Sequence, residues 1–151
     1  MEIKIVPKRD ISKYKRRIVE LTKPLEDVYP DYNNWLDKSL NEVDDTRTLI
    51  LVFNRKKVIG VSLLKHDSEE RKICSIMIHP SYTGRKYGTK LMDLSLTILR
   101  SKNSLGDIFI TIDSGKYNIF NKLFNKYNAK FIKKVDDLYK AGRTELFFKF
   151  N

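Results

Sequence analysis

The sequence has few of the residues that support special chemistry: one cysteine, two histidines, four prolines and six glycines among 151 residues. The single cysteine, Cys74, excludes a disulfide within the chain and favours a reducing, cytoplasmic compartment. A clustered zinc site takes four Cys or His ligands, so we expect no metal. No run approaches the roughly 20 apolar residues of a membrane span, and Met1 to Lys4 lack the apolar run of a signal peptide.

Positive charge is abundant but unevenly spread. Lys and Arg number 30 against 19 Asp and Glu, a formal net charge of +11. Residues 24–46 are the exception, because they hold seven acidic side chains and one lysine. A basic body attracts polyanions and an acidic segment attracts cations, although solvated charges also serve solubility alone. RNA is therefore one candidate partner.

The length and a hydrophobic content of 41% suit one domain over residues 1–151, with no repeat or linker. Hydrophobic periodicity predicts strands at 2–6, 49–53, 58–64, 73–78, 108–112, from 131, and 144–150. It predicts helices at 11–21, capped by Asp10, after Asp31 through Leu40, at 87–100 and at 116–127. The order β-α-α-β-β-β-α-β-α-β-β predicts an α/β fold, in which one twisted mixed sheet carries helices on both faces.

The stretch from Ile78 to Leu91 runs from a strand end into a helix start and carries the clearest functional signal. Backbone N–H groups at a helix start have no internal partner and lie at the positive end of the helix dipole, so they suit a diphosphate. Glycines allow close approach of a ligand, and basic side chains add charge. These residues are Gly84, Gly88, Arg85, Lys86 and Lys90. An ordinary turn before a helix is the alternative.

This stretch resembles the central motif of the GNAT acyltransferase superfamily, V-x-P-x-x-(R/Q)-G-x-G-x-(G/A)-x-x-L. The positions that match in register are Ile78, Pro80, Gly84, Gly88 and Leu91. Residues 123–131 are similar to the family's fourth helix and following strand, usually L-Y-E-K-x-G-F, and the order of elements matches nearly the whole chain. The resemblance implies a GNAT-like domain that moves an acetyl group from acetyl-CoA to an amine.

Three positions depart from the family's pattern. Thr83 stands where Arg or Gln is usual, which removes one side-chain contact to the pyrophosphate. Lys86 replaces the middle glycine and either crowds the diphosphate or offers it a charge. We favour the charge, because we expect helical backbone angles there, which lysine tolerates. Phe124 replaces the tyrosine that often protonates the leaving thiolate, and a phenyl ring donates no proton.

By the resemblance, acetyl-CoA lies in a V between the fourth and fifth strands. Its pantetheine is expected to pair along Ile76, Met77 and Ile78 like an added strand, with the amide of Met77 or Ile78 polarising the thioester. The pyrophosphate is expected at the amides of Thr83, Gly84, Arg85, Lys86, Tyr87, Gly88 and Thr89. A bulge in the fourth strand is common in the family, and the sequence neither shows nor excludes one.

An acceptor amine with a pKa near 10.4 must lose a proton before it attacks. Asp113, at the end of the fifth strand, is the candidate base, and capping of the next helix together with Ser114 is the alternative. His79 is a second candidate base, with a surface role as the alternative. Cys74 shares its strand alternation with Ile76 and Ile78, which predicts a core residue and not a covalent nucleophile.

Tyr29, Tyr32 and Trp35 lie among acidic residues in the segment that, by the resemblance, covers the acceptor site. Aromatic rings with carboxylates suit a cationic amine, so we expect these three residues to bind substrate. Core packing of Trp35 and helix capping by Asp31 are the alternatives.

Three functions fit the sequence. The first is N-acetyl transfer by direct attack on acetyl-CoA in a ternary complex, to a small amine or a protein amino group. The second is transfer to an amine carried on RNA, such as an aminoacyl-tRNA. The third is a CoA-binding or nucleic-acid-binding module without catalysis. The acceptor, the acyl length and the choice between monomer and homodimer stay open.

Overall fold

The computed structural model describes residues 1–102 and 106–151. Its strands join one sheet in the order β1-β2-β3-β4-β5-β7-β6, in which β4 and β5 are parallel and the other neighbours antiparallel. The strands are β1 (Glu2–Val6), β2 (Arg47–Asn54), β3 (Lys57–His66), β4 (Arg71–Ile78), β5 (Ile108–Asp113), β6 (Lys130–Asp136) and β7 (Thr144–Phe150). The expected mixed sheet is confirmed.

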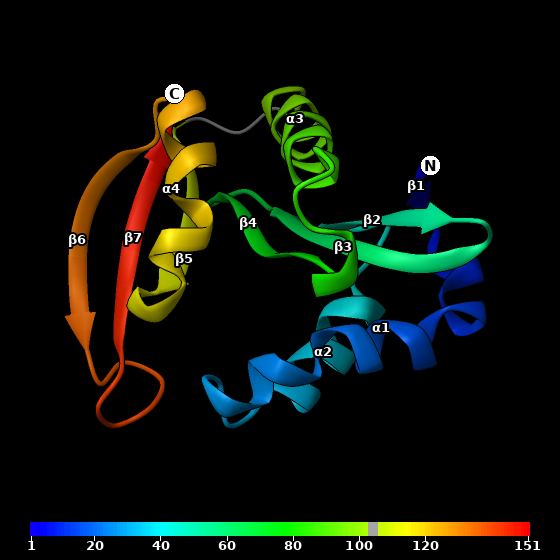
Figure 1. Ribbon diagram of the computed structural model, residues 1–151, viewed down its shortest axis with the longest axis horizontal. Helices are drawn as coiled ribbons and strands as arrows, with labels where there is room; N and C mark the ends of the chain where they lie inside the picture. Colours follow the sequence, from blue (N-terminus) through cyan, green and yellow to red (C-terminus); the bar gives the residue numbers. More distant parts are fainter. Residues whose placement is uncertain (103–105) are drawn as a thin grey trace.

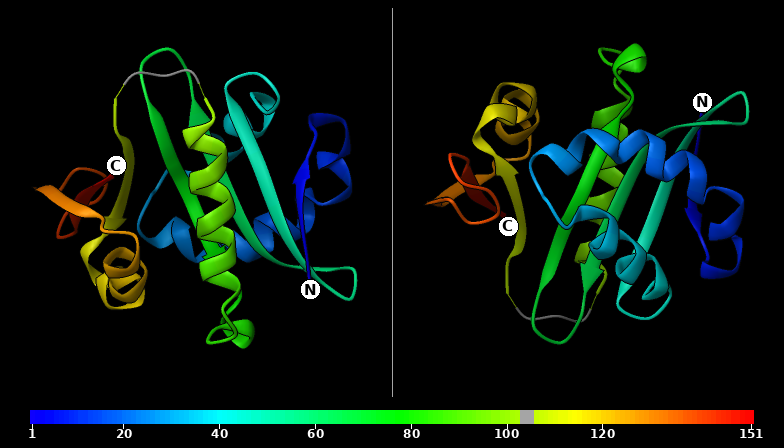
Figure 2. Two further views of the ribbon diagram at one scale, coloured as in Figure 1. Left: turned by 90° about the horizontal axis from the view of Figure 1, so that it is seen from above. Right: turned by 90° about the horizontal axis from the view of Figure 1, so that it is seen from below.

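Helices cover both faces of this sheet (Figures 1 and 2). The α-helices are α1 (Lys15–Thr22), α2 (Tyr32–Asn41), α3 (Tyr87–Arg100) and α4 (Tyr117–Lys126). The short 3-10 helices are η1 (Lys8–Lys13), η2 (Lys23–Asp27), η3 (Pro80–Tyr82) and η4 (Ser114–Lys116). In the described ranges, no helix is long and apolar enough to cross a membrane.

The sheet separates two cores because side chains alternate between its faces. Leu49 and Leu51 of β2 pack with α1 and α2, whereas Ile50 and Val52 pack with α3. The core beside α3 continues to β5, β7 and α4, where Phe124 is 2% exposed. Strands β4 and β5 therefore lie in the sheet between the core beside α3 and the core beside α1 and α2.

The helix predicted over 11–21 divides into η1 and α1. The prediction that Asp10 caps the α-helix is wrong, because Asp10 lies inside η1 and pairs with Lys13 at 3.2 Å. Asp31 does stand at the N-cap position of α2, but its carboxylate accepts a hydrogen bond from the side chain of Asn34 at 2.9 Å and makes no backbone cap.

Candidate active site

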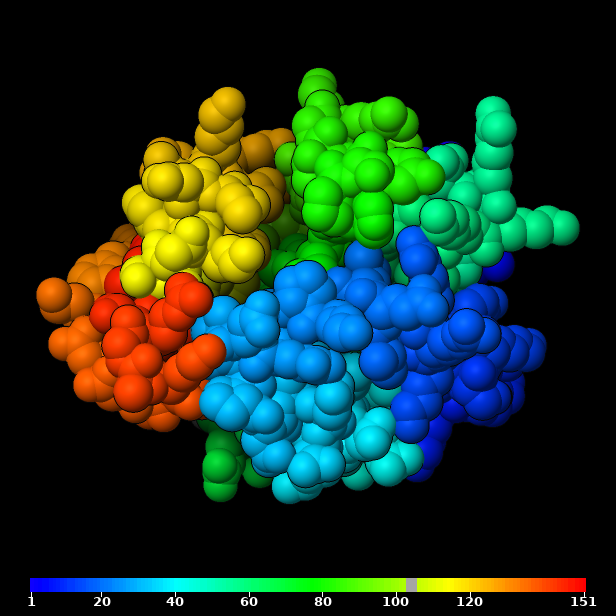
Figure 3. Space-filling model, turned by 60° about the horizontal axis from the view of Figure 1, so that its bottom comes forward, coloured from blue at the N-terminus to red at the C-terminus, as the bar shows by residue number. Residues whose placement is uncertain are grey.

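A V-shaped opening between β4 and β5 is the central feature of the site. The two strands pair only where Arg71 to Ile73 face Ile108 to Ile110. Beyond Ile73 they separate, and Figures 1 and 2 show β5 turning away with β7, β6 and α4. In Figure 3 a hollow lies between the yellow atoms of α4, the green atoms at the start of α3 and the blue atoms around η2 and α2. The second half of β4 therefore has one edge free of β5.

A β-bulge lies where the strands begin to separate. Leu63 of β3 faces Ser75 and Leu64 faces Ile73, so Cys74 is the extra residue. A bulge reverses the alternation of side chains. Ile73 and Ile76 both pack against the α3 side, and the prediction that Cys74 shares the face of Ile76 is therefore wrong.

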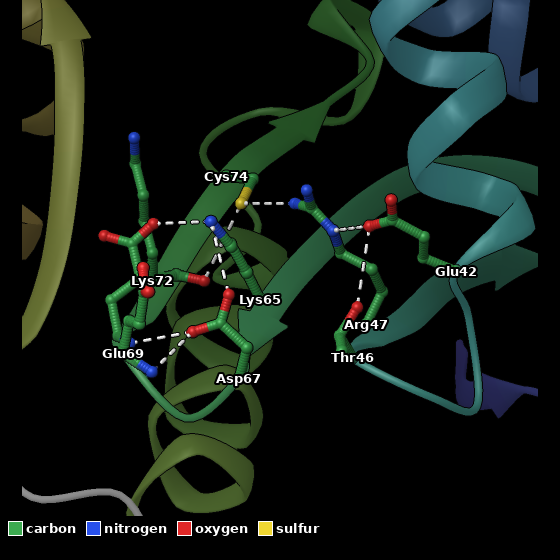
Figure 4. Close-up of polar contacts among 9 residues, drawn as sticks. Glu42, Thr46, Arg47, Lys65, Asp67, Glu69, Lys72 and Cys74 are labelled. Carbon is green, nitrogen blue, oxygen red and sulfur yellow. Dashed lines mark hydrogen bonds and ion pairs between the residues drawn. The ribbon is translucent and has the colours of Figure 1, made fainter.

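Cys74 instead contacts Arg47, as Figure 4 shows. The Arg47 guanidinium donates to the Cys74 sulfur at 3.1 Å and to the Glu42 carboxylate at 3.2 Å, and it lies over the Trp35 ring at 5.9 Å. Burial raises the pKa of the Cys74 thiol. The thiol is therefore a poor nucleophile, and these contacts hold the bulge against β2 and α2.

The backbone of β4 alternates between β3 and the V. The His79 N–H donates to the Ile59 carbonyl on β3 at 2.7 Å. In an antiparallel pair, N–H and C=O direction alternates from residue to residue. The N–H groups of Met77 and His79 therefore point toward β3, and those of Ile76 and Ile78 point into the V. Of the two amides expected to polarise a thioester, only that of Ile78 faces the opening.

The turn from β4 to α3 presents a row of backbone donors. Gly84 and Lys86 both have left-handed backbone angles, with φ of 77° and 65°. Within the described residues, none of the N–H groups from Gly84 to Thr89 donates a hydrogen bond inside the protein. Such a nest at a helix N-terminus is suited to an anion. The expectation of helical angles at Lys86 is wrong, because α3 begins one residue later, at Tyr87.

Other residues of this turn hold it in shape. The Thr83 N–H and hydroxyl both donate to the Pro80 carbonyl, at 3.4 and 2.9 Å, so the free donors begin after Thr83. The Arg85 guanidinium lies over the Tyr82 ring at 5.5 Å. The ring Nδ1 of His79 accepts from the Ser81 N–H at 3.1 Å, so His79 caps η3.

Helix α4 forms the opposite wall of the V. The Tyr127 hydroxyl donates to the Thr89 carbonyl at 3.2 Å and to the Asp93 carboxylate, which joins α4 to α3. Burial and the Asp93 bond raise the pKa of Tyr127 to about 12, so its proton is firmly held. Phe124 packs against Phe148 with ring centroids 4.5 Å apart. This side chain is part of the core.

Two buried carboxylates lie where β5 ends. Asp113 and Glu145 are opposite each other across the β5–β7 pair, and each is 3% exposed. One oxygen of Asp113 accepts from the Gly115 N–H at 3.0 Å and from Arg143 at 3.5 Å. Asp113 thus caps η4, as the alternative prediction stated. Its other oxygen is buried without a partner among the described residues.

Tyr29 is bound to this pair. Its hydroxyl donates to Glu145 at 2.7 Å, and its ring meets that of Tyr139, from the β6–β7 loop, at 5.1 Å. The loop is fastened nearby, because the Lys140 ammonium donates to the Asp27 carbonyl at 2.6 Å. These contacts join three segments that are distant in sequence: the segment before α2, strand β7 and the β6–β7 loop.

The other residues expected to bind substrate face elsewhere. Tyr32 is buried beside Ser75 and Thr22, and Trp35 lies against Arg47. The carboxylate of Asp37 pairs with Lys15 at 2.9 Å and is exposed. The acidic groups of the site thus come from β5 and β7 and not from residues 24–46. Glu145 was not predicted as a site residue. It shares one face of β7 with Phe147 and Lys149, and charged residues at alternate positions of a strand indicate a solvent-facing side.

Metal binding finds no support in the described part of the chain, where no group of three His, Cys, Asp or Glu side chains is placed to hold an ion. A mixed sheet that opens between the parallel strands β4 and β5, with free backbone donors at the start of the next helix, is the arrangement expected of a GNAT-type acyltransferase fold. The model of the acetyltransferase (GNAT) family matches residues 15–119. The chain therefore belongs to this family.

Solved structures agree with this assignment of the fold. A GNAT-family acetyltransferase from Desulfovibrio desulfuricans superposes with a TM-score of 0.75 at 12% identity, over 99% of this chain and 98% of that one. Ribosomal-protein-alanine N-acetyltransferase from Brucella melitensis gives 0.74 at 12%, over 99% and 98%. The aminoglycoside 6′-N-acetyltransferase from Enterococcus faecium gives 0.69 at 11%, over 99% and 96%. No curated protein matches the sequence.

Proposed function

We propose that the protein transfers an acetyl group from acetyl-CoA to a primary amine by direct attack in a ternary complex. The observation that carries the proposal is the free edge of β4 beside the free donors of the following turn. The turn follows β4 directly in the chain, so one ligand along the V could contact both groups of donors, as the resemblance to the family implies. A cytoplasmic location is proposed with it, on the single free cysteine.

Acetyl-CoA is expected to bind with its diphosphate at the N–H groups of Gly84 to Thr89. The helix start favours negative charge, and the exposed Arg85, Lys86 and Lys90 add to it. The pantetheine would pair with Ile76 and Ile78 as an added strand. Streptothricin acetyltransferase from Bacillus anthracis, which shares the fold over 74% of this chain, is a solved complex with acetyl-CoA.

The chemistry needs a polarised thioester, a neutral amine and a leaving thiolate. The Ile78 N–H, which faces the V, is placed to donate to the thioester oxygen as charge develops there. Holding the amine and the thioester together supplies a further large share of the rate, about 7–11 kcal/mol in well-oriented systems. Phe124 offers no proton, but a thiolate is a good leaving group and departs without one.

The acceptor is expected on the face of the sheet that carries α1 and α2, opposite the face that carries α3. Ile112 packs toward α3, so the next side chain, Asp113, points to the side of α1 and α2, together with Glu145. Met77 and Tyr29 pack against the core on that side as well. Two buried carboxylates and a tyrosine suit a cationic amine, a class that includes aminoglycosides and protein N-termini, the acceptors named for two of the structural neighbours.

Thermal unfolding with acetyl-CoA, followed by CoA release in the presence of kanamycin, spermidine and an alanine-initiated peptide, tests the proposal. We expect a higher Tm with acetyl-CoA and CoA release with at least one amine. Lys86→Ala should weaken binding, whereas Lys57→Ala, at the exposed start of β3, should not. Binding without transfer to any amine would indicate a module that has lost catalysis. An unchanged Tm and unchanged amide spectra of the turn would refute the proposal.

An amine carried on RNA is the second candidate acceptor. The part of the molecule beyond the V exposes six lysines of η4, α4 and β6: Lys116, Lys122, Lys126, Lys130, Lys133 and Lys134. Phosphate contacts release counterions, so RNA affinity should fall steeply from 50 to 200 mM salt. Binding of tRNA that is insensitive to salt, or absent at 50 mM, would exclude this candidate.

A further inference from the structure

We propose that Glu145 takes the proton from the acceptor amine, that Tyr29 positions its carboxylate, and that Asp113 binds the amine. This inference rests on the proposed function and assigns roles within the same site. It differs from the prediction made from sequence, in which Asp113 was the base.

The two carboxylates have unlike surroundings. Asp113 has a cationic partner in Arg143 at 3.5 Å and a backbone donor in Gly115 at 3.0 Å. Glu145 has the neutral hydroxyl of Tyr29 at 2.7 Å as its close partner. Because the close partner of Glu145 is neutral and Asp113 contacts the Arg143 guanidinium, Glu145 is the carboxylate that gains more from a proton. Glu145 is therefore the proton acceptor of the pair.

The charged and titratable groups that surround Glu145 come from every neighbouring element. They are Tyr29 before α2, Lys72 on β4, Asp113 on β5, and Tyr139 and Arg143 on the β6–β7 loop. Burial is the largest cause that raises the pKa of Glu145, and the Tyr29 hydrogen bond opposes it. A carboxylate whose pKa is moved toward neutrality is a more effective base at the pH of the cell.

The unpartnered oxygen of Asp113 completes the arrangement. This atom is buried without a hydrogen bond among the described residues, which costs free energy unless a ligand supplies a donor. An ammonium group has three N–H donors. One would be held by the unpartnered oxygen of Asp113, and a second would face Glu145. The site thus selects an amine that arrives as its cation.

The proton balance of the transfer follows from these roles. The ammonium gives one proton to the Glu145 carboxylate, and the neutral nitrogen forms a bond to the thioester carbonyl carbon. The C–S bond then breaks, and the electron pair leaves on sulfur. The remaining extra proton on nitrogen passes to the thiolate, which gives CoA thiol and the amide. Glu145 finally releases its proton to water.

The pH dependence of kcat/KM with kanamycin and spermidine as probe amines tests the assignment. Wild type should lose activity as the pH falls through the pKa of Glu145. Glu145→Gln, which keeps the shape and accepts the Tyr29 bond, should lower kcat/KM about 100-fold or more and remove this acid limb. Asp113→Asn should raise KM for the amine and keep the limb. Glu20→Gln, an exposed glutamate of α1, is the control and should match wild type.

Tyr29→Phe separates positioning from packing. It removes the hydrogen bond that stabilises the Glu145 carboxylate, so the acid limb should move to higher pH, a shift that a purely structural role would not cause. A Glu145→Gln enzyme with wild-type rate and pH profile would overturn the assignment, as would loss of the limb in Asp113→Asn.

A carbon-13 NMR titration of the glutamate carboxyls, in the complex with acetyl-CoA, needs no acceptor. One signal should titrate above the others and be missing in Glu145→Gln. If wild type transfers acetyl to neither probe while that signal is present, the proposed function fails for these amines and the titration of Glu145 stands. If all glutamates titrate together, Glu145 is not the proton acceptor.

Discussion

Lys86 combines an unfavourable backbone with a favourable charge. Its φ of 65° places a lysine in the left-handed region, where a side chain with a Cβ costs about 1–2 kcal/mol. The family's motif has a glycine there, which adopts this conformation without strain. Lys86 is therefore a strained residue in the turn for which we propose diphosphate binding.

Replacing this residue should therefore separate stability from affinity. Lys86→Gly should raise the free energy of unfolding by up to about 1 kcal/mol, measured by urea denaturation, because relief of strain exceeds the added flexibility of the unfolded chain. It should also weaken acetyl-CoA binding several-fold by calorimetry. Lys86→Ala is the matched control: it should lose the same affinity and gain no stability. Equal stability of both variants would contradict the account of strain.

The buried carboxylate of Glu145 makes a prediction about stability and pH. Burial raises its pKa, so the folded protein keeps the proton to a higher pH than the unfolded chain, whose glutamate titrates near 4.5. As the pH rises above 4.5, wild type therefore loses stability that Glu145→Gln keeps. The Tm of the variant relative to wild type should rise by about 2–4 °C from pH 4 to pH 8. Parallel Tm curves would show that Glu145 is not desolvated.

At the level of single residues, the sequence predicts what depends on local pattern. The turn with free backbone donors follows from its glycines and from the helix start, both read within fourteen residues. Glu145 and the backbone of Lys86 were missed, for different reasons. The burial of Glu145 depends on Tyr29 and Tyr139, which the fold brings to it from elsewhere in the chain. The angle at Lys86 depends on the exact residue at which α3 begins.

Strand β4 owes its shape to its neighbour β3 as well as to its own bulge. A Cβ on Gly60 would lie 2.6 Å from Ile78 Cδ1, 3.1 Å from Val52 Cγ2 and 3.2 Å from the Met77 carbonyl oxygen. Gly60 therefore lets the Ile78 side chain and the free end of β4 lie close to β3. This contact with β3 supports the edge of β4 that faces the V.

A methyl group at this position should disturb both fold and site. Gly60→Ala should cost about 1–3 kcal/mol of unfolding free energy, because one contact is to backbone, and should lower acetyl-CoA affinity by displacing β4. Gly88→Ala is the matched control, since its nearest neighbour is Leu123 Cδ1 at 4.0 Å. That variant should keep its stability. Urea denaturation of both proteins measures the difference, and an unaffected Gly60→Ala protein would contradict the packing described.

The elements themselves were predictable to the extent that their side chains repeat regularly. β1, α3 and β7 begin and end where hydrophobic periodicity places them. The bulge at Cys74 leaves no trace in residue type, because it is set by the register with β3. The division of the first helix into η1 and α1 likewise depends on tertiary packing that periodicity does not express.

The whole molecule consists of two parts of one sheet joined at a narrow place. β4 and β5 share pairing over three residues of each strand. Side-chain contacts also link the two parts across the V, among them those of Tyr127 with α3 and of Tyr29 with Glu145. A ligand that pairs with β4 and touches α4 would fill the opening between the parts. Binding should therefore slow hydrogen exchange of the β4 amides that face the V.

Hydrogen exchange of β4 amides should show this with residue resolution. In the free protein, the amides of Ile76 and Ile78 face the V and should exchange quickly, while those of Met77 and His79 are bonded to β3 and exchange slowly. Saturating acetyl-CoA should slow Ile76 and Ile78 at least tenfold, because both become bonded or covered. Met77 and His79 are already bonded to β3, so their exchange should slow less than that of Ile76 and Ile78. Equal slowing of all four amides would mean that the ligand stabilises the protein without pairing along this edge.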